Sequence, residues 1–333
     1  MGRLFIELLI QGALEYLMNI AFVFPGQGSQ SVGMLDVWAS HPELEALIKD
    51  ADDALGEPLS ALIHAGPAES LASTVNTQPA MLLAGVCAWR AWIRAGGPQA
   101  QIMAGHSLGE YAALVAAGAF TLADGLRLVR LRARAMQEAV PIGTGAMAAI
   151  LGLDDDVVIE TCQTLSASSG LRVEAVNFNA PSQVVIAGHK DAVAQACEAL
   201  KTRGAKRALP LPVSAPFHSS LLAPAGQHLA KALEDCQLQR PKVPVIHNVD
   251  VQVHTEPAAI RQALVEQAYH PVRWVQTIES MRKCGVDTVV EMGPGKVLSG
   301  LVSRIDKHLR VMSVYDPSTL EQALAALGHA RAS

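Results

Sequence analysis

The segment Gly105-His106-Ser107-Leu108-Gly109 carries the residues best suited to chemistry in this chain. It fits the pattern G-x-S-x-G, in which a serine stands on a tight turn between a strand and a helix. An apolar run over 102–104 precedes it, and an Ala-rich helical run over 110–117 follows. Such a turn exposes the serine hydroxyl beside the outward-pointing N–H groups of a helix N-terminus. The pattern predicts a nucleophilic Ser107 for acyl transfer; the plainer alternative is a Gly-rich turn with a capping serine.

A second Gly-rich segment, Pro-Gly-Gln-Gly-Ser-Gln over 25–30, follows an apolar run over 21–24 that reads as a buried strand. The backbone N–H groups of such a loop can cradle a phosphate or an oxyanion. The segment lacks the Lys-Ser/Thr pair of a P-loop and the third glycine of a dinucleotide fingerprint. Nucleotide binding is therefore disfavoured, and a contribution to an oxyanion hole is favoured.

A nucleophilic serine needs a general base, and the chain contains 11 histidines. His218 is the best candidate, because it lies on a loop stiffened by nearby prolines where the chain is expected to return to its main sheet. His106 adjoins the serine, but on such a turn its side chain is expected to point elsewhere. The alternative for His218 is a loop histidine that caps the next helix.

Four arginines, at positions 127, 130, 132 and 134, fall on one predicted helix over 122–140. At roughly 100° per residue they cannot share one face, so we expect most of them to be solvated and one to point inward. A buried guanidinium requires an anion, and a substrate carboxylate would satisfy it through two hydrogen bonds.

The elements that must position these groups alternate between short apolar runs and helical stretches. Strands are predicted at 21–24, 102–104, 243–246, 288–291 and 310–314. Helices are predicted at 43–55, 79–95, 122–140, 258–269 and 272–284, with further helices from 296 and after 317. This alternation implies an α/β fold with a largely parallel sheet.

The middle of the chain has a different order. Strands are predicted at 146–151, 172–178, 183–187 and 207–211, and helices at 154–165 and 191–203. The order β-α-β-β-α-β is the ferredoxin-like arrangement. We therefore expect a ferredoxin-like subdomain at 144–212, inserted in a main domain made of 18–143 and 213–333.

Composition excludes several classes of protein. The chain has 333 residues, is 50% hydrophobic and carries a formal charge of −5, which gives no general attraction to nucleic acid. Five scattered cysteines without C-x-x-C spacing fit a reducing cytoplasm and indicate neither a metal site nor a disulfide framework. No apolar run reaches the ~18 residues of a membrane span. Residues 1–17 do not read as a signal peptide; an upstream start, an artificial remnant and a short extra helix remain open.

Seven motifs in register give a resemblance to a known family. They are Phe24-Pro25-Gly26-Gln27-Gly28-Ser29-Gln30, Thr77-Gln78-Pro79-Ala80, Gly105-His106-Ser107-Leu108-Gly109-Glu110, Arg132 with 143–147, Asn177-Phe178-Asn179-Ala180-Pro181, Pro216-Phe217-His218 and Glu291-Met292-Gly293-Pro294-Gly295-Lys296. From about residue 18 to the C-terminus the chain resembles malonyl-CoA:acyl carrier protein transacylases. The resemblance implies an α/β-hydrolase-like main domain with a ferredoxin-like insert. It also implies malonyl transfer from malonyl-CoA to the phosphopantetheine thiol of acyl carrier protein, without a cofactor, usually for fatty acid biosynthesis.

The resemblance further implies a role for each residue of the catalytic centre. Ser107 would carry the malonyl group as an ester, and His218 would act first as base and then as acid. A backbone carbonyl would orient the histidine, and the matching position is Gln267. The backbone N–H groups of Gln27 and Leu108 would form the oxyanion hole.

Substrate-binding positions follow from the same resemblance. Arg132 would clamp the free carboxylate of the malonyl group. Gln78, Asn177 and Asn248 match positions that line or support the pocket. Phe217 suits a malonyl pocket, because its ring leaves little space for an α-methyl branch.

Three other functions remain as alternatives. A serine thioesterase or other hydrolase would place its histidine late in the chain and often carry an H-G-G-G loop, which is absent here. A non-catalytic carrier-docking domain is disfavoured by intact Ser107, His218 and Arg132. A malonyltransferase dedicated to polyketide synthesis or malonate decarboxylation would have the same motifs.

Acyl carrier proteins are acidic as a family, so an acidic chain must recruit one through local basic patches. One cluster contains Lys201, Arg203, Lys206 and Arg207, and another contains Arg282, Lys283 and Lys296. An ordinary solvated surface is the plainer interpretation of each cluster.

Overall fold

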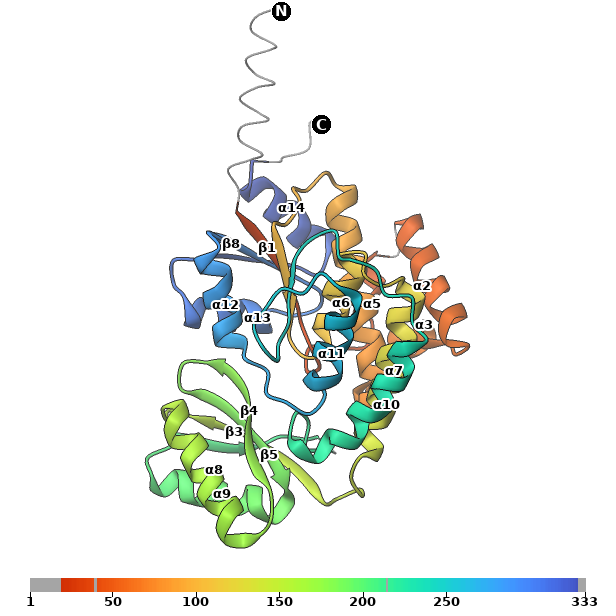
Figure 1. The fold of residues 1–333 in the computed structure, drawn as a ribbon. Helices are drawn as coiled ribbons and strands as arrows, with labels where there is room; N and C mark the ends of the chain where they lie inside the picture. The colour runs from red at the N-terminus through yellow and green to blue at the C-terminus, as the bar shows by residue number, and fades with distance from the viewer. Residues whose placement is uncertain (1–18, 39–40, 214, 329–333) are drawn as a thin grey trace, which may run out of the picture.

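The computed structural model describes residues 19–38, 41–213 and 215–328. These residues form an α/β fold with one parallel and one antiparallel sheet (Figure 1). The expected extension at 1–17 lies outside the described residues. Within the described ranges, no helix combines the length and the apolar character needed to cross a membrane.

The main sheet is parallel and has the strand order β7-β2-β1-β8-β9. Its strands are β1 (Ile20–Phe24), β2 (Ile102–Gly105), β7 (Val245–Ile246), β8 (Thr288–Met292) and β9 (Arg310–Val314). Every residue of β1 is buried, and alternate side chains enter two different hydrophobic clusters. This burial on both faces is why the strand reads as a continuous apolar run rather than an alternating one.

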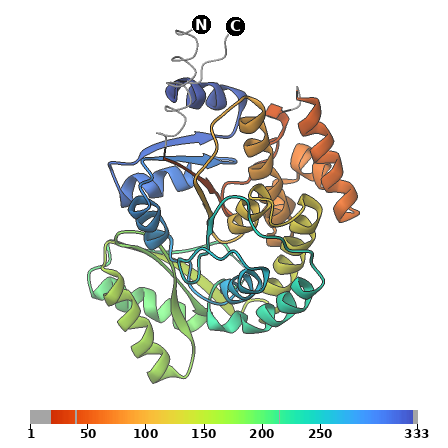
Figure 2. The same cartoon turned by 45° about the horizontal axis from the view of Figure 1, so that its top comes forward.

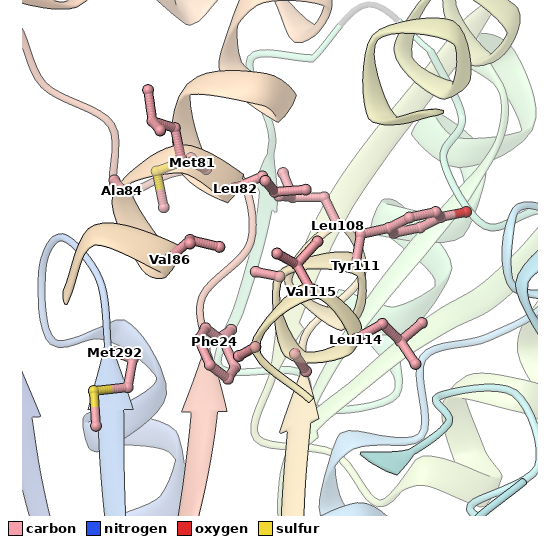
Figure 3. Close-up of a cluster of buried hydrophobic side chains, with 14 of the residues drawn as sticks. Phe24, Met81, Leu82, Ala84, Val86, Leu108, Tyr111, Leu114, Val115 and Met292 are labelled. Carbon is pink, nitrogen blue, oxygen red and sulfur yellow. The ribbon is translucent and has the colours of Figure 1, made fainter. Parts of the chain in front are cut away.

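Helices cover both faces of the main sheet. One face carries α5 (Thr74–Arg94), α6 (Gly109–Ala116), α7 (Leu122–Glu138), α10 (Ala223–Glu234), α11 (Pro257–Gln267) and α14 (Pro317–Ala326). Outside them lie α2 (Pro42–Leu55), α3 (Leu59–Ala65) and α4 (Ala68–Ala72). The other face carries α12 (Trp274–Lys283) and α13 (Val297–Ile305). Figure 3 shows the first core, where Phe24 and Met292 of the strands meet side chains of α5 and α6.

The predicted helix at 79–95 begins five residues too late, because α5 starts at Thr74 and contains Pro79 in its interior. A proline usually marks the first turn of a helix, and this one lies in the second. Three helices, α3, α4 and α10, were not predicted. Of these, α10 has a clear apolar stripe of Ala225, Leu229 and Leu233.

The second sheet is antiparallel, with the order β4-β5-β3-β6. It consists of β3 (Gly145–Leu151), β4 (Val173–Ala180), β5 (Gln183–His189) and β6 (Arg207–Pro210), with α8 (Asp155–Ser169) and α9 (Lys190–Thr202) packed on one face. The predicted β-α-β-β-α-β order is confirmed, and this strand order is the ferredoxin-like one. In Figures 1 and 2 the unit lies at the end of the molecule away from α14.

Strand β4 also pairs with a short segment at Val272, which lies outside this unit in the sequence. The N–H of Phe178 donates to the carbonyl of Val272 at 3.0 Å, and the N–H of Val272 donates to the carbonyl of Val176 at 2.9 Å. The exposed edge of β4 is therefore paired by a segment from the other part of the chain.

Candidate active site

Ser107 stands on the tight turn between β2 and α6 that its motif predicts, with a positive φ of 54°. A non-glycine residue in this region is strained, and such strain is common at functional sites. The two flanking positions require glycine, because neighbouring backbone atoms leave no room for a Cβ. A Cβ at Gly105 would lie 1.9 Å from the carbonyl carbon of Gly109, and one at Gly109 would lie 2.1 Å from the carbonyl oxygen of Phe24.

His218 lies beside the serine, with Nε2 2.7 Å from Ser107 Oγ. Its Nδ1 is 2.8 Å from the backbone carbonyl oxygen of Gln267, which can only accept a hydrogen bond. Nδ1 therefore carries the proton, and Nε2 is free to accept the proton of the serine. The sequence-predicted pair of Ser107 and His218 thus meets across 111 residues of chain.

The loop that carries His218 is fastened to β4. Two groups of Ser220, its backbone N–H and its hydroxyl, donate to the Glu174 carboxylate at 2.6 and 2.7 Å. His218 itself has a φ of 65°, a second strained residue at the site. This loop geometry leaves the imidazole almost fully buried against the serine.

Arg132 is the arginine of α7 that reaches the serine. Its Nη1 donates to Gln78 Oε1 at 2.8 Å, and its Nη2 donates to Gln267 Oε1 at 2.9 Å and to Ser107 Oγ at 3.1 Å. The centre of the guanidinium lies 5.5 Å from the ring centroid of Tyr111, a cation–π contact. Arg132 is 2% exposed, so this cation is held in a desolvated position beside the Ser107 hydroxyl.

Two arginines of α7 are buried, where the sequence predicted one. Besides Arg132, Arg130 is buried; it donates to Asn76 Oδ1 at 2.9 Å and pairs with Glu57 at 2.9 Å. Its charge is thus matched within the protein. Arg127 and Arg134 are exposed, as expected of a solvated face.

A cavity of about 230 Å³ opens at the serine, between the two sheets. Gln27 and Leu108 line it, and among the described residues their backbone N–H groups have no hydrogen-bond partner. Phe217 also lines the cavity, together with apolar side chains of the antiparallel sheet and of α13. Asn177 contributes a buried Oδ1 that no described residue contacts by a hydrogen bond.

Asn248, another of the predicted residues, supports the turn that carries Ser107. Asn248 Oδ1 accepts from the N–H of Ser107 at 2.8 Å, and its Nδ2 donates to the carbonyl of Gly105 at 2.7 Å. Asn248 therefore braces the turn and is not among the cavity-lining residues. His106 also lines the cavity, and its Nε2 contacts Asn179 Oδ1 at 2.7 Å.

Glu110 is the residue of this network that sequence reasoning missed. It is fully buried and contacts His247, Asn248 and Gln267 through its carboxylate. An acidic residue directly after the G-H-S-L-G motif, at the start of an Ala-rich helix, was the signal that could have found it.

Burial, followed by the nearby charge of Arg132, lowers the pKa of His218 to about 3. The imidazole of His218 therefore stays neutral far below the usual histidine range. We expect the rate of Ser107 acylation to stay constant between about pH 7 and about pH 5, where an ordinary histidine base would become protonated. Quenched-flow loading followed by mass spectrometry measures this rate. A decline centred near the ordinary histidine pKa would contradict the expectation, and Arg132→Ala should shift any decline to higher pH.

Comparison with known proteins agrees with this geometry. The model of the acyl transferase domain family matches residues 21–315. A malonyl CoA-acyl carrier protein transacylase of Salmonella typhimurium is 52% identical over 307 residues, which cover 92% of this chain and 99% of that protein. The chain therefore belongs to the malonyl CoA-acyl carrier protein transacylase family.

Solved structures agree with this membership. The crystal structure of an acyl-carrier-protein S-malonyltransferase from Burkholderia pseudomallei has a TM-score of 0.90 and 57% identity, and the match covers 92% of this chain and 100% of that one. A malonyl-transacylase in complex with a type II PKS acyl-carrier protein has a TM-score of 0.90 and 49% identity, and covers 92% and 99% of the two chains.

Proposed function

We propose that this chain moves a malonyl group from malonyl-CoA to the phosphopantetheine thiol of acyl carrier protein through an ester on Ser107. One observation carries the proposal: the buried guanidinium of Arg132 lies 3.1 Å from the nucleophilic oxygen. A desolvated cation at that distance favours an acyl group whose far end is an anion. Acetyl groups lack that anion, so the site should select malonyl.

The reaction runs in two halves, as a ping-pong mechanism. In the first half, His218 Nε2 takes the proton of Ser107 as Oγ attacks the thioester carbonyl. The N–H groups of Gln27 and Leu108 stabilise the resulting oxyanion, each by about 2.7–4 kcal/mol. The C–S bond then breaks, and His218 returns its proton to the leaving CoA thiolate.

The second half repeats these steps in reverse with the carrier thiol. His218 takes the thiol proton, the sulfur attacks the ester carbonyl, and the Ser107 oxygen leaves with the proton from His218. Throughout, the Gln267 carbonyl keeps the imidazole oriented. A backbone carbonyl carries no charge, so it orients the ring without the carboxylate that many serine hydrolases use.

Intact-mass measurement tests the proposal directly. The protein is mixed separately with malonyl-CoA, acetyl-CoA and methylmalonyl-CoA, and the mass of the adduct is recorded. We expect a stable adduct with malonyl-CoA alone, because acetyl lacks the carboxylate and Phe217 restricts an α-methyl branch. Rapid release of free malonate without a stable adduct would instead indicate a hydrolase.

We also propose the division into a main domain of 18–143 and 213–333 with a subdomain of 144–212. The separate hydrophobic cluster beneath α8 and α9 supports it. A place in fatty acid biosynthesis in the cytoplasm is proposed as well, supported by five cysteines that are all free thiols. Transfer rates to the carrier proteins of fatty acid and polyketide synthesis, measured side by side, test the pathway.

Carrier docking is proposed for the basic cluster at the end of the subdomain. Within it, Lys201 pairs with Glu198 at 2.8 Å and Arg203 pairs with Glu160 at 2.7 Å. Lys206 and Arg207 take part in no ion pair with the described residues. They are therefore the two cations of the cluster left for a partner.

Reversing the charges of Lys206 and Arg207 should raise KM for the carrier protein and flatten its salt dependence, because rim charges mainly steer association. Malonyl-CoA loading of Ser107 should not change. Steady-state transfer at several salt concentrations measures both effects. The same reversal of Lys201, already paired within its helix, is the matched control. Unaltered carrier kinetics at low salt would exclude this patch and direct attention to Arg282, Lys283 and Lys296.

A further inference from the structure

Glu110, the second residue of α6, is a fully buried acid that no step of the proposed reaction uses. His247 Nδ1 lies 2.7 Å from its Oε1. The N–H of Asn248 and the Nε2 of Gln267 each donate to its Oε2 at 2.9 Å. Burying a carboxylate is costly unless its charge and its hydrogen bonds are matched. These groups satisfy the hydrogen bonds of the carboxylate, and the charge of Arg132, which is permanent, also acts on it.

The cation that this network reaches is Arg132, across the side-chain amide of Gln267. Arg132 Nη2 donates to Gln267 Oε1 at 2.9 Å, and Gln267 Nε2 donates to Glu110 Oε2 at 2.9 Å. Only one amide orientation satisfies both neighbours, with the oxygen toward the cation and the nitrogen toward the anion. The carboxylate and the guanidinium are thus an ion pair bridged by one amide.

The same glutamine also serves the other two catalytic groups. Its backbone carbonyl accepts a hydrogen bond from His218 Nδ1 at 2.8 Å, and its Nε2 donates to the carbonyl of Ser107 at 2.9 Å. A group that fixes the Gln267 side chain therefore fixes the base, the nucleophilic turn and the guanidinium together.

We propose that Glu110 is a positioning residue, the resident counter-ion of Arg132, which locks Gln267 in the orientation that the site requires. The inference rests on the proposed function, because it treats Arg132 as the group that receives the malonyl carboxylate. Glu110 and the malonyl carboxylate are like charges that share one cation, so Glu110 orders the site while weakening malonyl binding.

Affinity measurements on a Ser107→Ala background test whether Glu110 weakens malonyl binding. Glu110→Gln removes the charge and keeps the shape: its amide oxygen still accepts from Asn248 and Gln267, and its amide nitrogen takes the place of Oε1 beside His247. By isothermal titration calorimetry, the double variant should bind malonyl-CoA about threefold to tenfold more tightly than Ser107→Ala alone, because one like charge is gone. Acetyl-CoA affinity should not change. If Glu110 merely held the fold, replacing it would weaken the binding of both thioesters.

The matched control is Glu291→Gln on the same background. Glu291 is equally buried, and its carboxylate accepts the N–H groups of Leu298 and Ser299 at the start of α13. This variant should leave the ratio of the two affinities unchanged. Malonyl-CoA binding that is unchanged or weaker in Glu110→Gln overturns the inference.

A second variant keeps the inference testable if Glu110→Gln does not fold. Glu110→Asp, made with Ser107 intact, retains the charge but withdraws the carboxylate from Gln267. It should lower kcat about tenfold with KM for malonyl-CoA unchanged; an unchanged kcat overturns the positioning role. If Ser107→Ala alone binds no malonyl-CoA, the proposed function falls, and the role of Glu110 falls with it.

Discussion

Ser107→Ala should abolish both the malonyl adduct and malonyl transfer while the fold remains intact. Removing the nucleophile of a serine enzyme lowers kcat by about a millionfold, because binding and the oxyanion hole alone cannot open the covalent route. The substitution deletes one hydroxyl that contacts His218 and Arg132, and it leaves the strained backbone as it was. Intact-mass spectrometry after incubation with malonyl-CoA measures the adduct, and circular dichroism checks the fold.

Ser29→Ala is the matched control, since Ser29 lines the same cavity without contacting His218. That variant should still acquire one malonyl mass. A Ser107→Ala protein that acquires the malonyl mass would show that another group is the nucleophile.

Arg132→Ala should weaken the preference of the enzyme for malonyl over acetyl donors. Truncating one side of a desolvated ion pair leaves the other charge unpaired, at a cost of about 3–5 kcal/mol. Malonyl transfer should therefore fall steeply and acetyl transfer much less. The acetyl to malonyl ratio of kcat/KM should rise by about two orders of magnitude or more. Initial rates with both donors, at matched protein concentration, measure that ratio.

Arg130→Ala is the control for the general effect of losing a buried arginine from α7. Arg130 pairs with Glu57 and Asn76 rather than with the serine, so its loss should lower thermal stability and leave the donor ratio unchanged. If both donors fall equally in Arg132→Ala, the guanidinium has a structural role and does not select the carboxylate.

Several features of this protein could be predicted from the sequence because they depend on neighbours along the chain. Turn glycines and a strand–turn–helix pattern are local, and they located Ser107. Hydrophobic periodicity is also local, and it predicted the strands of both sheets and the β-α-β-β-α-β order of the middle of the chain. Errors arose where local signals conflict, as at Pro79, whose usual position at a helix start placed the boundary of α5 too late.

The partners of each catalytic group were decided by the tertiary structure. Arg130 and Arg132 lie two residues apart on one helix. Only the family resemblance pointed to Arg132, and helix periodicity could not say that both are buried or which faces the serine. That depends on where α5 places Asn76 and Gln78, whose side-chain oxygens accept hydrogen bonds from the two guanidinium groups.

Glu110 shows most clearly that the tertiary structure decides which partners a polar group has. Its partners His247, Asn248 and Gln267 lie 137 to 157 residues further along the chain. The sequence by itself determined which residues could do chemistry and on which elements they stand. Only packing between segments so distant in the chain decided which donors and charges surround them, because a buried polar group is satisfied by its neighbours in space rather than in sequence.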